Sequence, residues 1–151
     1  MQSCFKVNAS LLDPHVVLHE IKFLVQQGQY NMAFSQALSA ADPFFVVSTC
    51  EMVCPTITIG KDPCPLETPV LLSLIGKLSE DLATKTTIKI KYLEAAVLSL
   101  VKGGPASQSS EKCALTRLFN KIEELLKQNP PHDMERMAKH LNLVIQSSLC
   151  C

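Results

Sequence analysis

The sequence predicts an all-α protein of about seven helices packed in antiparallel pairs, as in an α-solenoid. Hydrophobic residues make up 47% of the chain but aromatic residues only 5%, so leucine, valine, isoleucine and alanine must fill the core. Apolar residues recur at spacings of three and four in one segment after another. Most of these segments are separated by short turns, which makes consecutive helices neighbours, although no repeat of fixed period is present.

The first predicted helix spans about residues 14–27. Asp13 followed by Pro14 is a typical helix start, because an N-cap carboxylate accepts backbone N–H groups and proline needs no partner in the first turn. Gly28 ends the helix, since glycine readily takes the left-handed conformation. The second helix, at about 30–40, carries Phe34 between the small residues Ala33 and Ala37. We expect Phe34 to lie in the core.

The third helix, at about 43–53, begins with a second Asp-Pro pair, Asp42 and Pro43, and ends before Pro55. The prolines and glycine that follow exclude long regular structure. The β-branched run at 56–59 has no obvious partner strand, so we expect an extended loop packed on the helices.

The four remaining helices are predicted at about 68–82, 86–102, 111–128 and 133–149. Thr68 and Pro69 open the first of them, whose leucines and isoleucine form one clear apolar stripe. Glycine and proline at 103–105 end the next, and Asn129 before two prolines ends the one after it. Residues 1–151 therefore read as a single helical domain.

Charge and hydropathy restrict the function classes. The 14 basic and 14 acidic side chains balance, so the chain lacks the positive field that drives non-specific nucleic-acid binding. Direct RNA binding is not expected. No apolar run reaches the roughly 18 to 20 residues of a membrane span, and the N-terminus does not resemble a signal peptide. The sequence predicts an intracellular protein with no membrane contact and with reduced cysteines.

The sequence gives little support for a metal site or a catalytic nucleophile. Cys50, Cys54 and Cys64 could bind zinc, but no fourth ligand has sensible spacing, and small apolar groups on a helix face explain the first two better. His15 and His19 lie four apart without a third ligand. We expect no metal, no cofactor and no enzymatic activity. A loop nucleophile at Cys64 is the enzymatic alternative.

Two further groups of residues allow alternative interpretations. The terminal pair Cys150 and Cys151 resembles a prenylation signal, but no nucleotide-binding loop accompanies it. Four lysines cluster around the fourth and fifth helices and are read as a solvated face, with an anion, RNA or acidic-peptide site as the alternative. They are Lys77, Lys85, Lys89 and Lys91.

Several ordered stretches resemble one known family. They are 28–31, 33–34, 37–42, 50–51, 63–66, 69–75, Lys89 and 92–97. Together they are similar to the C-terminal domain of the enhancer of mRNA-decapping protein 4 family, also called Hedls. The resemblance covers about residues 20–101 and extends to the last two helices only by pattern and length. The sequence departs from the family pattern at Gly76 and Lys77.

The resemblance implies an armadillo- or HEAT-like stack at the C-terminal end of a longer scaffold that assists decapping without cleaving the cap. It implies cytoplasmic location, targeting to processing bodies, and protein partners among decapping and 5′-to-3′ decay factors. The isolated domain is expected to be monomeric, because the family's coiled coil lies outside it. The alternative function is a helical adaptor from unrelated machinery such as vesicle trafficking.

Partner binding is expected at polar or aromatic groups near helix starts and on the long loop. The candidate protein-binding residues are Tyr30, Glu51, Lys77, Glu94 and Arg136. Each has a structural alternative, and the ring of Tyr30 is expected to pack near the first turn. No catalytic or cofactor-binding residue is proposed.

Overall fold

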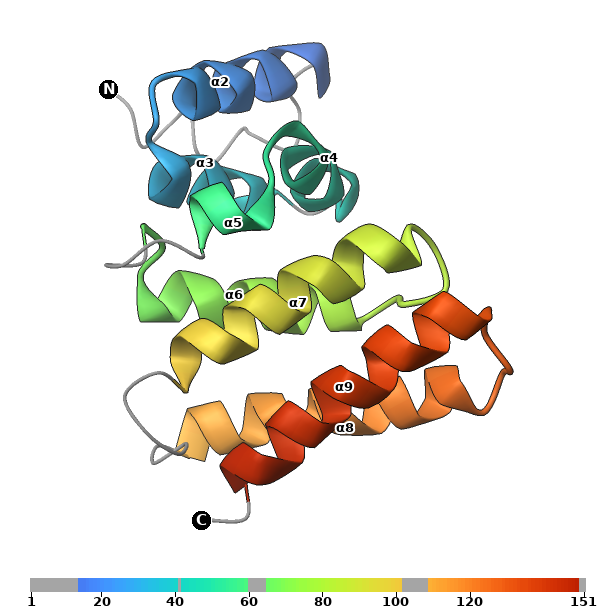
Figure 1. Ribbon diagram of the computed structural model, residues 1–151. Helices are drawn as coiled ribbons and strands as arrows, with labels where there is room; N and C mark the ends of the chain where they lie inside the picture. The colour runs from blue at the N-terminus through green and yellow to red at the C-terminus, as the bar shows by residue number, and fades with distance from the viewer. Residues whose placement is uncertain (1–13, 41, 60–64, 102–108, 150–151) are drawn as a thin grey trace.

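The computed structural model describes residues 14–40, 42–59, 65–101 and 109–149, and within them it contains helices and no strand (Figure 1). The helices are α2 (Pro14–Gln26), α3 (Tyr30–Ser39), α4 (Phe44–Met52), α5 (Pro55–Thr58), α6 (Thr68–Ser79), α7 (Thr86–Leu100), α8 (Ser109–Leu126) and α9 (His132–Leu149). Among the described helices, none is both long and apolar enough to cross a bilayer.

The helices stack in pairs from the N-terminus to the C-terminus (Figure 1). The pair α6–α7 packs between α3–α4 on one side and α8–α9 on the other, so that α3, α6 and α8 form one row while α4, α7 and α9 form a second. Helix α2 covers the first pair and contacts both α3 and α4. This arrangement is a short α-solenoid, and the predicted fold class is confirmed.

The turns between helices follow from identifiable residues. Gly28 has φ +77°, the left-handed conformation predicted for it, and lets α3 begin directly after α2. The backbone N–H of Phe44 donates to Asp42 Oδ1 at 2.9 Å, which accounts for the start of α4. Asp13 lies outside the described residues. The left-handed conformation of Lys85, with φ 51°, was not predicted.

The turn before α7 is held by Asp81 instead of a glycine. Its carboxylate accepts hydrogen bonds from the backbone N–H of Ala83 and the hydroxyl of Thr84, both at 3.0 Å. These donors, the Ala83 amide first, lower the pKa of Asp81. The turn therefore carries a fixed negative charge and places Lys85 at the start of α7.

The core is continuous through all the helix pairs. Phe34 is completely buried, as predicted, and its ring centroid lies 5.8 Å from that of Tyr92 on α7. Other side chains with no exposed surface come from five further helices: Ile21, Leu74, Ile75, Leu93, Leu118 and Leu141. At the surface between α3 and α6, the backbone N–H of Glu67 donates to Asn31 Oδ1 at 2.8 Å.

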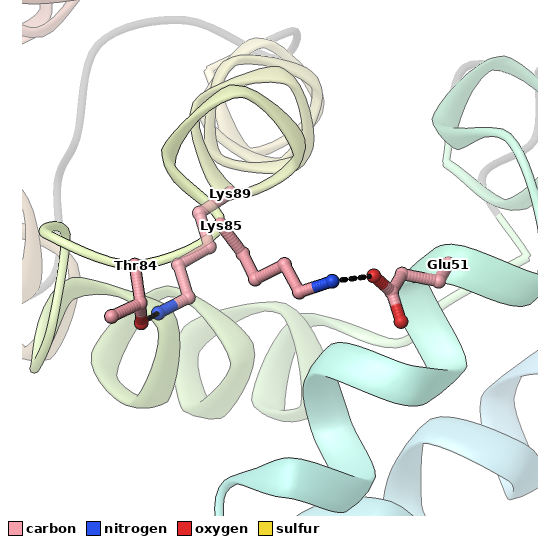
Figure 2. A network of polar contacts seen from close by, with 4 residues as sticks. All are labelled: Glu51, Thr84, Lys85 and Lys89. Carbon is pink, nitrogen blue, oxygen red and sulfur yellow. Dashed lines mark hydrogen bonds and ion pairs between the residues drawn. The ribbon is translucent and has the colours of Figure 1, made fainter.

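Two sequence predictions are wrong. Residues 55–58 form a helical turn instead of an extended loop, because Pro55 suits the first turn of a helix and the Thr58 backbone N–H donates to the Cys54 carbonyl. Lys89 does not belong to a solvated face. Its side chain is buried, and its Nζ donates to the Asp81 carbonyl. Nζ also donates to Thr84 Oγ1 at 3.2 Å (Figure 2).

A candidate protein-binding groove

A groove of about 820 Å³ opens between the end of α4, the α5 turn and one face of α7. Helices α4 and α5 both contact α7, so the two walls have fixed positions. Most of the lining is apolar, and two large side chains remain accessible in it: Met52 is 36% exposed and Leu98 is 44% exposed. An open apolar surface of this kind typically receives a ligand or a partner.

One stripe of α7 forms the first wall. Ile88, Lys91, Ala95 and Leu98 follow one another at helical spacing and all line the groove. The opposite stripe of the same helix, which includes Leu93 and Val97, is buried in the core. Helix α7 therefore carries a second, largely apolar stripe, on which Ile88 and Ala95 are partly buried and Leu98 is exposed.

The floor of the groove is fixed by Tyr92. Its hydroxyl donates to the carbonyl of Val53 and receives a hydrogen bond from Thr58 Oγ1 at 3.3 Å. Burial raises the pKa of Tyr92 well above its usual value, although the Thr58 hydroxyl opposes this shift. The phenol thus stays neutral and joins α7 both to the residue after α4 and to the end of α5.

Charged residues occupy the rim, and two of them are paired. Glu51 Oε2 lies 2.8 Å from the Nζ of Lys85, which reaches across from the start of α7 to α4 (Figure 2). Glu94 Oε2 lies 2.7 Å from Nδ1 of His140 on α9. Lys91 is exposed on the same rim.

The structure brings together two of the five candidate binding residues. Glu51 and Glu94 line the groove from its two walls. Tyr30 is partly buried and packs against the core, Lys77 is half-buried on α6, and Arg136 pairs with Asp133 at 3.0 Å on the surface of α9. The three residues Tyr30, Lys77 and Arg136 do not line the groove.

Sequence reasoning missed Met52 and Leu98, and it named Lys91 only within the lysine cluster whose alternative interpretation was an anion, RNA or acidic-peptide site. A signal for Leu98 was present, since Ile88, Lys91, Ala95 and Leu98 form a second stripe on α7 beside the predicted core stripe. The opposing wall gave no such signal, because it depends on how α4 and α5 pack on α7.

The described cysteines differ in environment. Cys50 is buried, and desolvation, followed by the charge of Glu51, raises the pKa of its thiol far above the usual value, so the nucleophilic thiolate is suppressed. Cys54 is exposed, with its Sγ 2.8 Å from Thr56 Oγ1. Within the described ranges, no group of His, Cys, Asp or Glu side chains could hold a metal ion. Cys64, Cys150 and Cys151 lie outside these ranges.

The protein is expected to lose stability as the pH rises above about 9, where thiols and then phenols of an unfolded chain ionise. Cys50 and Tyr92 both have raised pKa values in the folded protein, so the unfolded state releases these protons first. Their contribution is complete below the usual thiol value of 9.0 and declines above it. Urea denaturation at about pH 8 and about pH 10.5 measures the decline.

The matched variant for this test is Cys50→Ala, which eliminates the buried thiol, one of the two groups whose ionisation in the unfolded chain is expected to lower stability between these pH values. It should reduce the loss of unfolding free energy between the two pH values, whatever it does to stability at neutral pH. An unchanged pH dependence in Cys50→Ala would contradict a role for this thiol.

Comparison with known proteins gives one consistent family. Residues 21–141 match the family model described as "Enhancer of mRNA-decapping protein 4, C-terminal". The chain is 41% identical to enhancer of mRNA-decapping protein 4 of Danio rerio over 140 residues, which are 93% of this chain and 10% of that protein. It is 38% identical to the protein of that name from Homo sapiens over 139 residues, or 92% of this chain and 10% of that protein.

A solved structure agrees with these sequences. The "Crystal structure of the conserved C-terminal region of Ge-1" superposes with a TM-score of 0.75 and 29% identity, covering 87% of this chain and 98% of that chain. The family-model match includes α8 and about the first half of α9, so the sequence similarity extends beyond the 20–101 segment predicted to carry it. The chain spans about a tenth of the length of the curated relatives.

Proposed function

The chain belongs to the enhancer of mRNA-decapping protein 4 family by its C-terminal domain, as the sequence resemblance indicated, and from this membership we propose that it is a non-catalytic protein-interaction domain of a decapping scaffold. In this role it helps to assemble decapping and 5′-to-3′ decay factors and to target the scaffold to cytoplasmic processing bodies. Residues 1–151 act as one domain and as a monomer when isolated.

The groove between α4–α5 and α7 supports this proposal most directly. It combines the accessible apolar side chains Met52 and Leu98 with a charged rim, and packed helices form both of its walls. These are the features by which helical repeat proteins hold segments of their partners. The relatives' name describes an enhancer of decapping, and enhancement through assembly requires binding surfaces only.

Family membership favours this role over a vesicle-trafficking adaptor, the alternative function. The two roles share a helical fold and differ in their partners. The identity of the captured proteins therefore distinguishes them.

We expect this chain, used as bait in cytoplasmic extract, to enrich decapping or 5′-to-3′ decay factors, and the variant Leu98→Glu to lose them. A buried charge in the groove should weaken capture about tenfold or more, because groove-centre residues often contribute about 2 kcal/mol to binding. Quantitative mass spectrometry of the bound fraction provides the measurement.

Leu143→Glu is the matched control for this experiment. Leu143 is 64% exposed on α9 and lies outside the groove lining, so this variant adds the same charge at an exposed helical leucine elsewhere. It should capture the same proteins as the unmodified chain. Enrichment of trafficking adaptors with no decay factor above background would refute the decapping role, and equal loss in both variants would refute the groove as the binding site.

A further inference from the structure

We propose that the groove binds an acidic amphipathic helix of a partner protein, with apolar residues on the groove floor and a carboxylate paired with Lys91. This inference rests on the proposed function and narrows it to one class of partner. Three observations support the proposal: the groove-facing stripe of α7, the carboxylates on the rim that already have partners, and the charge of Lys91.

The shape of the site favours a helical ligand. The groove lies between helices, and the described chain has no sheet edge to which an extended peptide could add a strand. Along α7 the lining extends from Ile88 to Ser99, which at the helical rise corresponds to about 16 Å. A partner helix of about three turns matches this length. Its apolar residues at spacings of three and four would contact Met52, Ala95 and Leu98 in the lining.

The charged residues on the rim indicate which sign of charge the ligand should carry. Glu51 forms an ion pair with Lys85, and Glu94 Oε2 lies within hydrogen-bond distance of His140 Nδ1. Lys91 is the remaining charged residue of the lining, and among the described residues it has no ion-pair or hydrogen-bond partner. A ligand therefore meets two carboxylates that already have partners within the protein and one lysine that has none among the described residues, so an acidic residue on its polar edge is favoured by Lys91.

The same features argue against a nucleic acid as the ligand. One free lysine offers a single phosphate contact, whereas nucleic-acid sites combine several. Tyr92, the aromatic residue in the lining, is only 1% exposed, and its ring packs on Phe34 instead of presenting a face to bases.

A phage-displayed library of disordered intracellular segments, each about 16 residues long, tests the proposal because that length allows three helical turns. We expect the selected peptides to share apolar residues at helical spacing and at least one Asp or Glu. The tightest peptide is then synthesised, and its affinity for the full chain is measured by fluorescence anisotropy. Lys91→Glu should weaken it about tenfold, and a peptide with its acidic residue changed to lysine should recover binding to that variant.

Lys112→Glu is the matched control, because Lys112 is an exposed lysine on α8 outside the groove. It should leave the affinity unchanged, whereas Leu98→Glu should abolish binding. Selected peptides without acidic residues, binding that survives Leu98→Glu, or failure of the charge-reversed peptide to recover affinity would each overturn the proposal. Displacement of the peptide by single-stranded RNA at equal concentration would overturn it in favour of a nucleic-acid site.

The outcome separates this inference from the proposed function. If decay factors are captured from extract but no acidic helix binds the groove, only this inference fails. If acidic helices bind the groove while no decay factor is captured, the decapping role fails and the specificity of the groove stands.

Discussion

Replacing Phe34 with alanine is expected to lower the free energy of unfolding by about 3–5 kcal/mol, the usual cost of truncating a buried aromatic ring. Phe34 has no exposed surface and lies on α3, the helix that contacts α2, α4 and α6. Its ring also packs on Tyr92 at 5.8 Å between centroids. The truncation therefore leaves a cavity where the first helix pair meets the second.

Urea denaturation followed by far-UV circular dichroism measures this loss. Phe23→Ala is the control, since Phe23 is 56% exposed on α2 and its truncation should change stability by only about 0.5 kcal/mol or less. The expected loss is a large fraction of the roughly 5–15 kcal/mol by which domains are stable. Equal effects of the two substitutions would contradict the packing around Phe34.

Most of the fold could be predicted because the sequence marks its helices by local signals. Gly28 and Asp42 each determine a helix end through a conformation or a hydrogen bond within a few residues, and the structure contains both. The observed ends of α2, α3 and α4 lie within about two residues of the expected ones, and such differences are usual where helices fray. Short turns then restrict which helices can be neighbours.

The features that sequence reasoning missed depend on distant contacts. Residues 55–58 have β-branched character, but their helical turn packs on α7, where Thr58 meets the hydroxyl of Tyr92. Lysine is normally an exposed residue, and Lys89 is buried only because the Asp81 carbonyl and Thr84 receive its ammonium group. Tertiary packing overrides local preference at both places.

The candidate site was predictable only in part. Reasoning from the expected fold and the family resemblance selected Glu51 and Glu94, which line the groove, together with three residues that do not. The groove itself arises because α4 ends at Met52 and the chain turns through α5 before it reaches α6. That interruption leaves one stripe of α7 partly exposed. The depth of the groove depends on how the helices pack, which no local sequence pattern predicts.

The stacked arrangement also places the groove away from the last helix pair, so that pair can be destabilised without changing the groove. The groove is built by α4, α5 and α7, whereas α8 contacts mainly α6 and α9. In a solenoid each helix pair is stabilised chiefly by its neighbours, so damage at one end should spread only partly to the other. The last helix pair is the place to test this.

Replacing Leu118 with alanine is expected to cost about 2–5 kcal/mol and to loosen α8 and α9 first. Leu118 is completely buried on α8, which packs against α6 and α9. Hydrogen exchange followed by mass spectrometry should show faster exchange in α8 and α9, with a smaller effect in α2 to α4, which have their main contacts among themselves and with α6 and α7.

Leu143→Ala is the control for this experiment. Leu143 is 64% exposed on α9, so its truncation should leave exchange in every helix close to that of the unmodified protein. If Leu118→Ala instead accelerates exchange equally in all helices, the chain unfolds as one cooperative unit and the nearest-neighbour description fails. If the loss is confined to the last pair, the groove stays formed while α8 and α9 open, because all of its lining residues lie outside that pair.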